Sequence, residues 1–269
     1  MRAGVFRDKI VVITGASAGI GLEIARQLAT DGAALVLAAR SAPLLEAAAD
    51  ECRALGARVL HVPTDVSERT QCQALIEQAI AHFGRLDVLI NNAGISMHAR
   101  FDELTDPDAA ERIMRINYLG SVWCTYYALP HLKRSRGRIV AVSSLTGING
   151  VPTRTLYAAS KHAMKGFFDS LRIELRRDGV SVTVVYPGFV ATDIAHRALA
   201  ADGGLLGERP VDKGAVMSAT ECARLTLEAA AGRRRELVMT GIARIGILLK
   251  AFVPGLVDRV AERKVSRGR

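Results

Sequence analysis

The chain has few cysteines, and none of them is spaced for chemistry. Four cysteines occur in 269 residues, with no Cys-x-x-Cys pair and no metal-type spacing, and the six histidines show no such spacing either. This pattern argues against a disulfide framework, a thiol redox motif and a metal site. We expect reduced, partly buried cysteines in a cytoplasmic protein, three of them within helical patterns. The cysteines are Cys52, Cys72, Cys124 and Cys222.

The sequence also lacks a long hydrophobic run. No stretch of about twenty apolar residues occurs, so no transmembrane helix is predicted. The first apolar run begins within ten residues of the start, and we therefore expect no signal peptide. There is no internal repeat, low-complexity segment or linker, and 269 residues with 49% apolar content suit one globular domain.

Acidic residues are scarce in one region only. The formal net charge is +9, and residues 233–269 hold ten basic residues against three acidic ones, a local excess of +7. The remainder of the chain is nearly neutral. This distribution argues against nucleic acid as a partner and assigns the basic character to a tail.

Apolar β-branched runs alternate with helical periodicity, which predicts a parallel sheet with helices on both faces. The expected strands are residues 10–14, 34–39, 58–63, 86–91, 138–143, 180–186 and 236–239. The expected helices are residues 19–31, 42–55, 67–83, 107–130, 156–178 and 213–231. Residues 189–212 have no clear periodicity and follow a strand end, where open α/β sheets bind ligands. We expect them to form a substrate lid within a catalytic domain of residues 1–240.

The first expected strand runs directly into a glycine-rich turn and then a helix. The turn reads Gly15-Ala16-Ser17-Ala18-Gly19-Ile20-Gly21. Glycines in this context let a backbone approach a pyrophosphate, and a helix N-terminus offers free N–H groups to phosphate. The spacing G-x-x-x-G-x-G differs from the usual G-x-G-x-x-G. Glycines also make ordinary tight turns, but phosphate binding is the favoured interpretation.

Tyr157 and Lys161 lie four residues apart, one turn along the same helix face. A phenol normally loses its proton near pH ~10, and an ammonium group a few ångströms away lowers that pKa. Ser144 lies thirteen residues before Tyr157, at the end of an apolar run that indicates a buried strand. Such a strand, turn and helix could bring the three side chains together as a proton-transfer site.

Together these features resemble the classical, single-domain short-chain dehydrogenase/reductase family. The resemblance runs from about Lys9 to about Met239. Its motifs, in the family's order, are Thr14 to Gly21, Asp65, Asn91-Asn92-Ala93-Gly94, Asn117, Ser144, Tyr157, Lys161 and Pro187-Gly188. The resemblance implies a Rossmann-type doubly wound sheet of about seven strands. It also implies a homodimer or homotetramer formed through helices 107–130 and 156–178.

The resemblance further implies a nicotinamide cofactor, with NADP(H) favoured over NAD(H). Ala39 occupies the family's acidic position, and Arg40 the next one, which is basic in many NADP-preferring members. A guanidinium can bind a 2′-phosphate bidentately, although Arg40 could simply be a solvated residue after a strand. Ala18 stands where many NADP-preferring relatives carry a second basic residue. The implied cofactor-binding residues are Gly15, Ser17, Gly19, Ile20, Gly21, Arg40, Asp65, Val66, Asn91, Ala93, Gly94, Tyr157, Lys161, Pro187, Gly188, Val190 and Thr192.

Two cofactor residues carry open alternatives. By resemblance, Asp65 accepts a hydrogen bond from the adenine amino group; otherwise it caps the next helix, a role that Ser67 fits better. The segment Asn91 to Gly94 borders the cofactor's ribose in the family. We interpret that segment as more structural than chemical.

The implied reaction is reduction of a ketone or aldehyde, or oxidation of a secondary alcohol, by hydride transfer. Tyr157 would be the general acid or base, Lys161 would lower its pKa, and Ser144 would donate a hydrogen bond to the carbonyl oxygen. Ser143 is a rival for this role, but by resemblance the thirteen-residue offset to the tyrosine matches Ser144 in the family. Asn117 would hold a water that links Lys161 to solvent, or else bond a neighbouring helix. No metal is expected.

Residues 241–269 form a basic amphipathic extension. It suits a membrane surface, or else packs on a partner subunit or covers the substrate mouth. A weak likeness to relatives that act on lipid or steroid ketones favours a bulky, apolar substrate. The alternatives are an NAD-dependent alcohol dehydrogenase working in the oxidative direction and a non-catalytic nucleotide-binding or membrane-associated protein.

Overall fold

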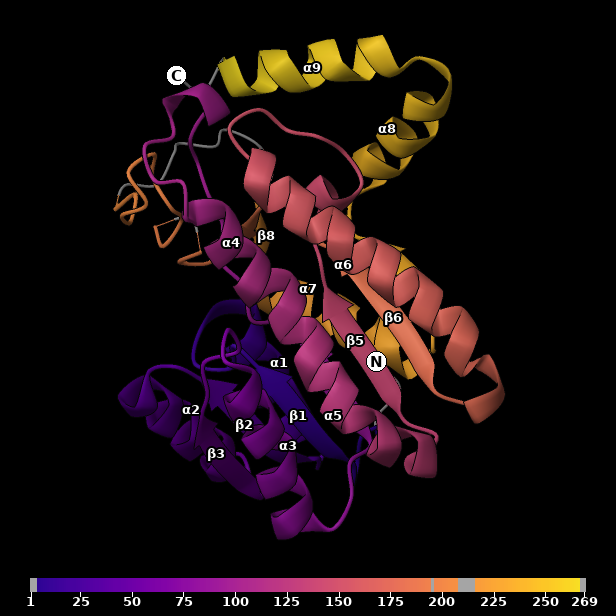
Figure 1. Ribbon diagram of the computed structural model, residues 1–269. Helices are drawn as coiled ribbons and strands as arrows, with labels where there is room; N and C mark the ends of the chain where they lie inside the picture. Colours follow the sequence, from indigo (N-terminus) through magenta and orange to yellow (C-terminus); the bar gives the residue numbers. More distant parts are fainter. Residues whose placement is uncertain (1–3, 195, 208–215, 267–269) are drawn as a thin grey trace.

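A seven-stranded parallel sheet forms the centre of the computed structural model, which describes residues 4–194, 196–207 and 216–266. Helices cover both faces of the sheet, whose order is β3-β2-β1-β4-β5-β6-β9 (Figure 1). The strands are β1 (Ile10–Thr14), β2 (Ala34–Ala39), β3 (Val59–Pro63), β4 (Val88–Asn91), β5 (Arg138–Val142), β6 (Ser181–Tyr186) and β9 (Glu236–Val238). The order reverses between β1 and β4, the switch point where such sheets bind ligands. The predicted doubly wound fold is confirmed.

Side chains alternate along each strand and divide the core into two halves. In β1, Val11 and Ile13 pack with α1, α2 and α7, whereas Ile10 and Val12 pack with α3, α5 and α6. Because both faces are covered, β1 and β2 are buried at every position. These helices are α1 (Gly19–Thr30), α2 (Ala42–Ala54), α3 (Arg69–Phe83), α5 (Gly120–Ser135), α6 (Thr155–Glu174) and α7 (Ala219–Ala231).

The single helix expected over residues 107–130 is three consecutive segments. α4 (Ala109–Met114) leads into a π-helical turn, Arg115–Leu119, and then into α5. α5 continues past Pro130 to Ser135, and Arg136 ends it with a φ of 49°. The predicted end at 130 was wrong, since buried Leu132 holds the last turn against the core beyond the proline.

Two other expected segments differ at their boundaries. α7 begins at Ala219, because the Ser218 hydroxyl caps it by accepting from the Glu221 amide at 3.1 Å. The expected start at 213 is therefore too early, and residues 213–215 lie outside the described residues. Within 189–212, the short strand β7 (Val190–Ala191) pairs with β8 (Met217–Ser218), so this segment is partly regular; residues 195 and 208–212 lie outside the description.

The basic residues assigned to one tail lie at two places in the fold. Arg233, Arg234 and Arg235 precede β9 and lie at the amino-terminal edge of the sheet. After β9 the chain forms α8 (Gly241–Phe252) and α9 (Pro254–Ser266) at the opposite, carboxyl edge (Figure 1). The expectation of a single basic tail is therefore wrong.

All four cysteines are buried free thiols, and all four lie on helices, one more than expected. Among the described residues, no group of three or more His, Cys, Asp and Glu side chains is arranged to hold a metal ion. Within the same part of the chain, no helix is long and apolar enough to cross a membrane.

Candidate active site

A cleft of about 870 Å³ opens at the carboxyl ends of the central strands. Most of the residues singled out in the sequence line it. Those that do are Gly15, Ser17, Gly19, Ile20, Arg40, Asp65, Val66, Ala93, Gly94, Ser144, Tyr157, Lys161, Pro187, Gly188, Val190 and Thr192. Three expected site residues, Gly21, Asn91 and Asn117, do not line the cleft.

Most residues of the glycine-rich turn line the cleft. Gly15 and Gly19 have φ values of 66° and 56°, a region that favours glycine. Ala18 precedes α1 with extended backbone and no side-chain cap, and the first turn of α1 holds no acidic residue. The first amides of α1 therefore have no side-chain partner and can donate to an anion.

Gly21 packs α1 against the turn. A Cβ there would lie 2.2 Å from the Gly15 oxygen. We expect Gly21→Ala to lower the free energy of unfolding by about 1–3 kcal/mol, because α1 or the turn must shift. The control is Gly166→Ala, on the exposed face of α6 with nothing within 4 Å of the new methyl, which should raise stability by about 0.5–1 kcal/mol. Urea unfolding followed by circular dichroism measures both, and equal stabilities would contradict this packing.

Asn91 and Asn92 lie at the end of β4, at the switch point of the sheet. Asn92 Nδ2 donates to the Thr14 and Gly15 carbonyls at 2.9 and 3.1 Å, and the Thr14 hydroxyl accepts from the Asn92 amide at 3.0 Å. Asn91 is buried and donates to the Thr125 hydroxyl of α5 at 3.0 Å. Asn91, expected to bind the cofactor, therefore lies behind the site, whereas Asn92 lines it.

Ser144, Tyr157 and Lys161 converge on one part of the cleft. Ser144 follows β5, and its hydroxyl accepts from the Thr146 amide at 3.2 Å and hydrogen-bonds Tyr157. Tyr157 and Lys161 lie one turn apart on α6, and the Lys161 ammonium is 5.8 Å from the centre of the Tyr157 ring. The two side chains are almost buried, with 8% and 3% exposed.

Burial dominates the electrostatics of this group. It raises the pKa of Tyr157, although the hydrogen bond with Ser144 and the charge of Arg154 act against it. Burial lowers the pKa of Lys161 to about 8, and the ammonium donates to the Val142 carbonyl at 3.0 Å. The net direction for Tyr157 is therefore opposite to the one expected from its lysine neighbour. The phenol holds its proton more firmly than free tyrosine does.

Asn117 occupies the π-helical turn and is fully buried. Its Oδ1 accepts from the Ile95 amide at 2.8 Å, and its Nδ2 donates to the Ile95 carbonyl and the Ser160 hydroxyl at 3.0 and 2.9 Å. The side chain thus bonds a neighbouring helix, as the alternative interpretation held. The role in holding a water stays a prediction.

Arg40 and Asp65 lie at the part of the cleft next to β2 and β3. Arg40 is exposed after buried Ala39. The Asp65 carboxylate accepts from the Ser67 amide and hydroxyl at 2.9 and 2.7 Å. Neither Asp65 nor Ser67 caps α3, which begins at Arg69 after Glu68. The expectation that Ser67 caps this helix was therefore wrong.

The cleft is also lined by residues that were not predicted to bind the cofactor or to act in catalysis. They are Ala18, Ala39, Ser41, Leu44, Thr64, Asn92, Ile95, Arg112, Ile116, Val142, Ser143, Asp193, Ile194, Arg197, Leu199, Gly203 and Leu205. Leu199 packs in a small apolar cluster with Met97 and Tyr157. The expected lid segment therefore contributes Leu199 to the same apolar cluster as the tyrosine. In the sequence, only the position of this segment after Pro187-Gly188 indicated that it lies near the site.

Comparison with known proteins defines the family. Residues 9–202 match the family model described as short chain dehydrogenase. The chain is 38% identical over 257 residues to 11-beta-hydroxysteroid dehydrogenase A of Arachis hypogaea, covering 93% of this chain and 73% of that one. It is 44% identical over 187 residues to 11-beta-hydroxysteroid dehydrogenase-like 2 of Arabidopsis thaliana, covering 69% of this chain and 60% of that relative's length.

Two solved structures resemble the whole fold. A short-chain dehydrogenase/reductase of Burkholderia phymatum in complex with NAD superposes with a TM-score of 0.83 at 29% identity, over 93% of this chain and 95% of that one. An alcohol dehydrogenase of the archaeon Thermococcus sibiricus, complexed with 5-hydroxy-NADP, gives 0.76 at 32% identity, over 87% and 96%. The chain belongs to the short-chain dehydrogenase/reductase family of oxidoreductases.

Proposed function

We propose that this enzyme reduces a ketone or aldehyde, or oxidises the corresponding secondary alcohol, with NADP(H) as its cofactor. The observation that carries the proposal is the convergence of Ser144, Tyr157 and Lys161 on a cleft that also contains the uncapped glycine-rich turn. The solved relatives with NAD and 5-hydroxy-NADP support a nicotinamide cofactor. A panel of ketones and secondary alcohols, followed at nicotinamide absorbance with both cofactors, tests it.

The residues present fit a nicotinamide dinucleotide. The free amides at the start of α1 would hold the pyrophosphate, Asp65 and Val66 the adenine, and Lys161 the ribose next to the nicotinamide. When bound, the nicotinamide supplies or accepts the hydride. Arg40, with no carboxylate at Ala39 to repel phosphate, supports NADP(H) over NAD(H).

Tyr157 is the proposed proton donor in reduction and the proton acceptor in oxidation. In reduction, its hydroxyl donates the proton to the substrate oxygen, to which the Ser144 hydroxyl donates a hydrogen bond. The raised pKa keeps the phenol protonated at neutral pH, which suits an acid. As negative charge forms on Tyr157, the Lys161 ammonium stabilises it. These groups support reduction over oxidation at neutral pH.

We expect kcat/KM for reduction to fall above pH of about 8. Lys161 is charged below its pKa of about 8 and neutral above it, whereas Tyr157 stays protonated in this range. The fall should approach about tenfold per pH unit. Lys165→Met, which removes a partly exposed ammonium paired with Asp169 further along α6, is the control and should leave the profile unchanged. A profile that stays flat to about pH 10 would contradict the role of Lys161.

The cleft supports a bulky, apolar substrate. Its apolar lining includes Ile95, Ile116, Ile194, Leu199 and Leu205, and several relatives are named as hydroxysteroid dehydrogenases. The described part of residues 189–212 would act as the lid, and it places Leu199 in the apolar cluster that also contains Tyr157.

We also propose a homodimer or homotetramer in the cytoplasm. The exposed apolar residues Tyr126 of α5 and Ile173 of α6 support a contact between copies through these helices. The four free thiols suit a reducing compartment. Light scattering of the purified protein measures the number of subunits, and a monomer would contradict the proposed homodimer or homotetramer.

A further inference from the structure

Helix α8 carries an apolar face that points away from the rest of the described chain. Ile245, Leu248, Leu249 and Phe252 follow one another at i, i+3, i+4 and i+7, which places them on one side of the helix. They are 60%, 67%, 43% and 83% exposed. A helix that packs on its own domain turns such a face inward. This one leaves it in solvent.

Exposed apolar side chains also follow α8 along the chain. Val253 between the two helices and Leu256 and Val260 of α9 are also exposed. We call these seven side chains the tail face. Exposed large apolar side chains gathered in one short segment of a folded protein mark an interaction site.

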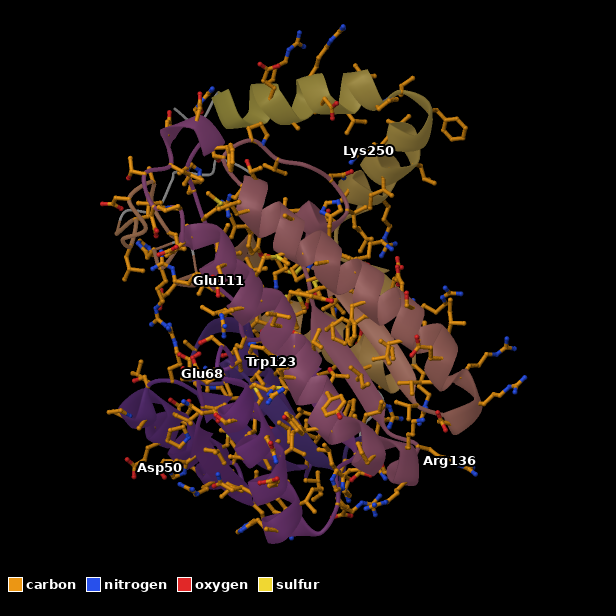
Figure 2. The ribbon with its side chains drawn as sticks, viewed as in Figure 1. Asp50, Glu68, Glu111, Trp123, Arg136 and Lys250 are labelled. Carbon is orange, nitrogen blue, oxygen red and sulfur yellow. The ribbon has the colours of Figure 1, made fainter. Side chains whose placement is uncertain are left out.

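The tail face lies next to the mouth of the cleft. Lys250 of α8 donates to the Ile148 carbonyl at 3.2 Å, and Figure 2 shows it beside the loop that follows β5. Ile148 lies in the loop that begins at Ser144. A Cβ on cleft residue Gly188 would lie 3.6 Å from Thr240, which directly precedes α8. The helix is thus anchored to the rim of the active site, with its apolar side turned outward.

The charge of the tail favours a lipid surface over a second copy of the chain as the partner of the tail face. Residues 241–269 contain seven basic and two acidic residues, a net charge of +5. A symmetric contact through the tail face would bring two such tails together, and like charges across an interface are unfavourable. An anionic bilayer accepts the apolar side chains and attracts the basic ones. No described helix can span a membrane, so the contact would be peripheral.

We propose that the tail face docks this enzyme on an anionic lipid bilayer, with α8 lying in the plane of the interface and the cleft mouth beside it. An apolar substrate dissolved in the bilayer then reaches the cleft without crossing bulk water. The docking itself depends on neither the cofactor nor the reaction.

The test is co-sedimentation of the whole chain with vesicles. We expect binding to phosphatidylcholine vesicles that contain about 30% phosphatidylserine, and weaker binding to phosphatidylcholine alone or at high salt. The double variant Leu248→Glu/Phe252→Glu should bind at least about tenfold more weakly. Leu55→Glu, at an exposed leucine after α2, is the matched control and should bind like the unaltered chain.

A second variant probes charge and leaves the apolar face intact. Arg259→Glu on α9 should weaken binding to the anionic vesicles only. Circular dichroism and turnover of a water-soluble ketone, unchanged in all these proteins, would show that each variant is folded.

Three results would overturn the docking proposal. The unaltered chain could fail to sediment with anionic vesicles, or the double variant could sediment equally well. The double variant could also lower the molecular mass in light scattering while no protein binds vesicles, which would assign the tail face to a contact between copies. Vesicle binding needs no substrate, so its failure leaves the proposed reaction untouched, and a failed ketone assay leaves the docking untouched.

Discussion

We expect Tyr157→Phe to abolish turnover and to leave NADPH binding almost unchanged. The substitution removes only the hydroxyl that hydrogen-bonds Ser144 and donates the proton, and the ring keeps its place in the apolar cluster with Met97 and Leu199. A positioned acid or base contributes about 10²–10⁴-fold, so kcat should fall at least about a hundredfold. Steady-state kinetics and fluorescence titration with NADPH measure the two quantities.

Tyr126→Phe is the control for this variant. Tyr126 is an exposed tyrosine of α5 with no lysine four residues further on, and its substitution should change neither kcat nor NADPH binding. If Tyr157→Phe kept the kcat of the unaltered enzyme, Tyr157 would not be the acid.

Arg40→Asp should reverse the cofactor preference. Arg40 is exposed at the cleft rim after β2, where a carboxylate repels a 2′-phosphate and can accept a hydrogen bond from a 2′-hydroxyl. A hydrogen bond to a charged group contributes about 1.5–3 kcal/mol, or about 10–100-fold. Because NADPH loses this bond and NADH gains one, the ratio of their kcat/KM values should fall at least about a hundredfold.

The matched control makes the same change of charge at a position far from the cleft. Arg177→Asp alters an exposed residue in the 3₁₀ turn that follows α6, at the opposite end of the sheet, and should leave the cofactor ratio unchanged. If Arg40→Asp also left the ratio of kcat/KM for NADPH to that for NADH unchanged, Arg40 would not determine the cofactor preference.

The sheet could be predicted from the sequence because its strands are buried on both faces. Runs such as Ile10–Thr14 and Ala34–Ala39 are apolar at almost every position, and each expected strand overlaps an observed one. The glycine-rich turn was visible for a similarly local reason, since Gly15 and Gly19 adopt backbone angles that favour glycine. These features could be predicted because each is determined by residues close together in the sequence.

The interruption at Asn117 has no local cause. The π-helical turn brings its amide to Ile95 and Ser160, residues 22 and 43 positions away, and periodicity cannot show such contacts. The last turn of α5 after Pro130 likewise depends on the packing of Leu132 in the core. Both errors arose because tertiary contacts overrode local preference.

The site was predicted in its residues but not in its electrostatics. Spacing, together with the resemblance to the family, indicated that Ser144, Tyr157 and Lys161 could meet, and all three line the cleft. The direction of the pKa shift of Tyr157 depends on how deeply the folded chain buries the phenol, which spacing does not reveal. For the same reason the sequence did not identify Arg154, whose charge acts against the effect of burial on Tyr157.

Transfer of deuterium from NADPH that carries deuterium at both C4 positions of the nicotinamide tests the central claim most directly. A ketone that the enzyme accepts is turned over with the labelled cofactor, and the alcohol is analysed by mass spectrometry. The account predicts one deuterium on the carbinol carbon with the unaltered enzyme and no labelled alcohol with Tyr157→Phe. An alcohol without deuterium, or an equal yield of labelled alcohol from the variant, would contradict it.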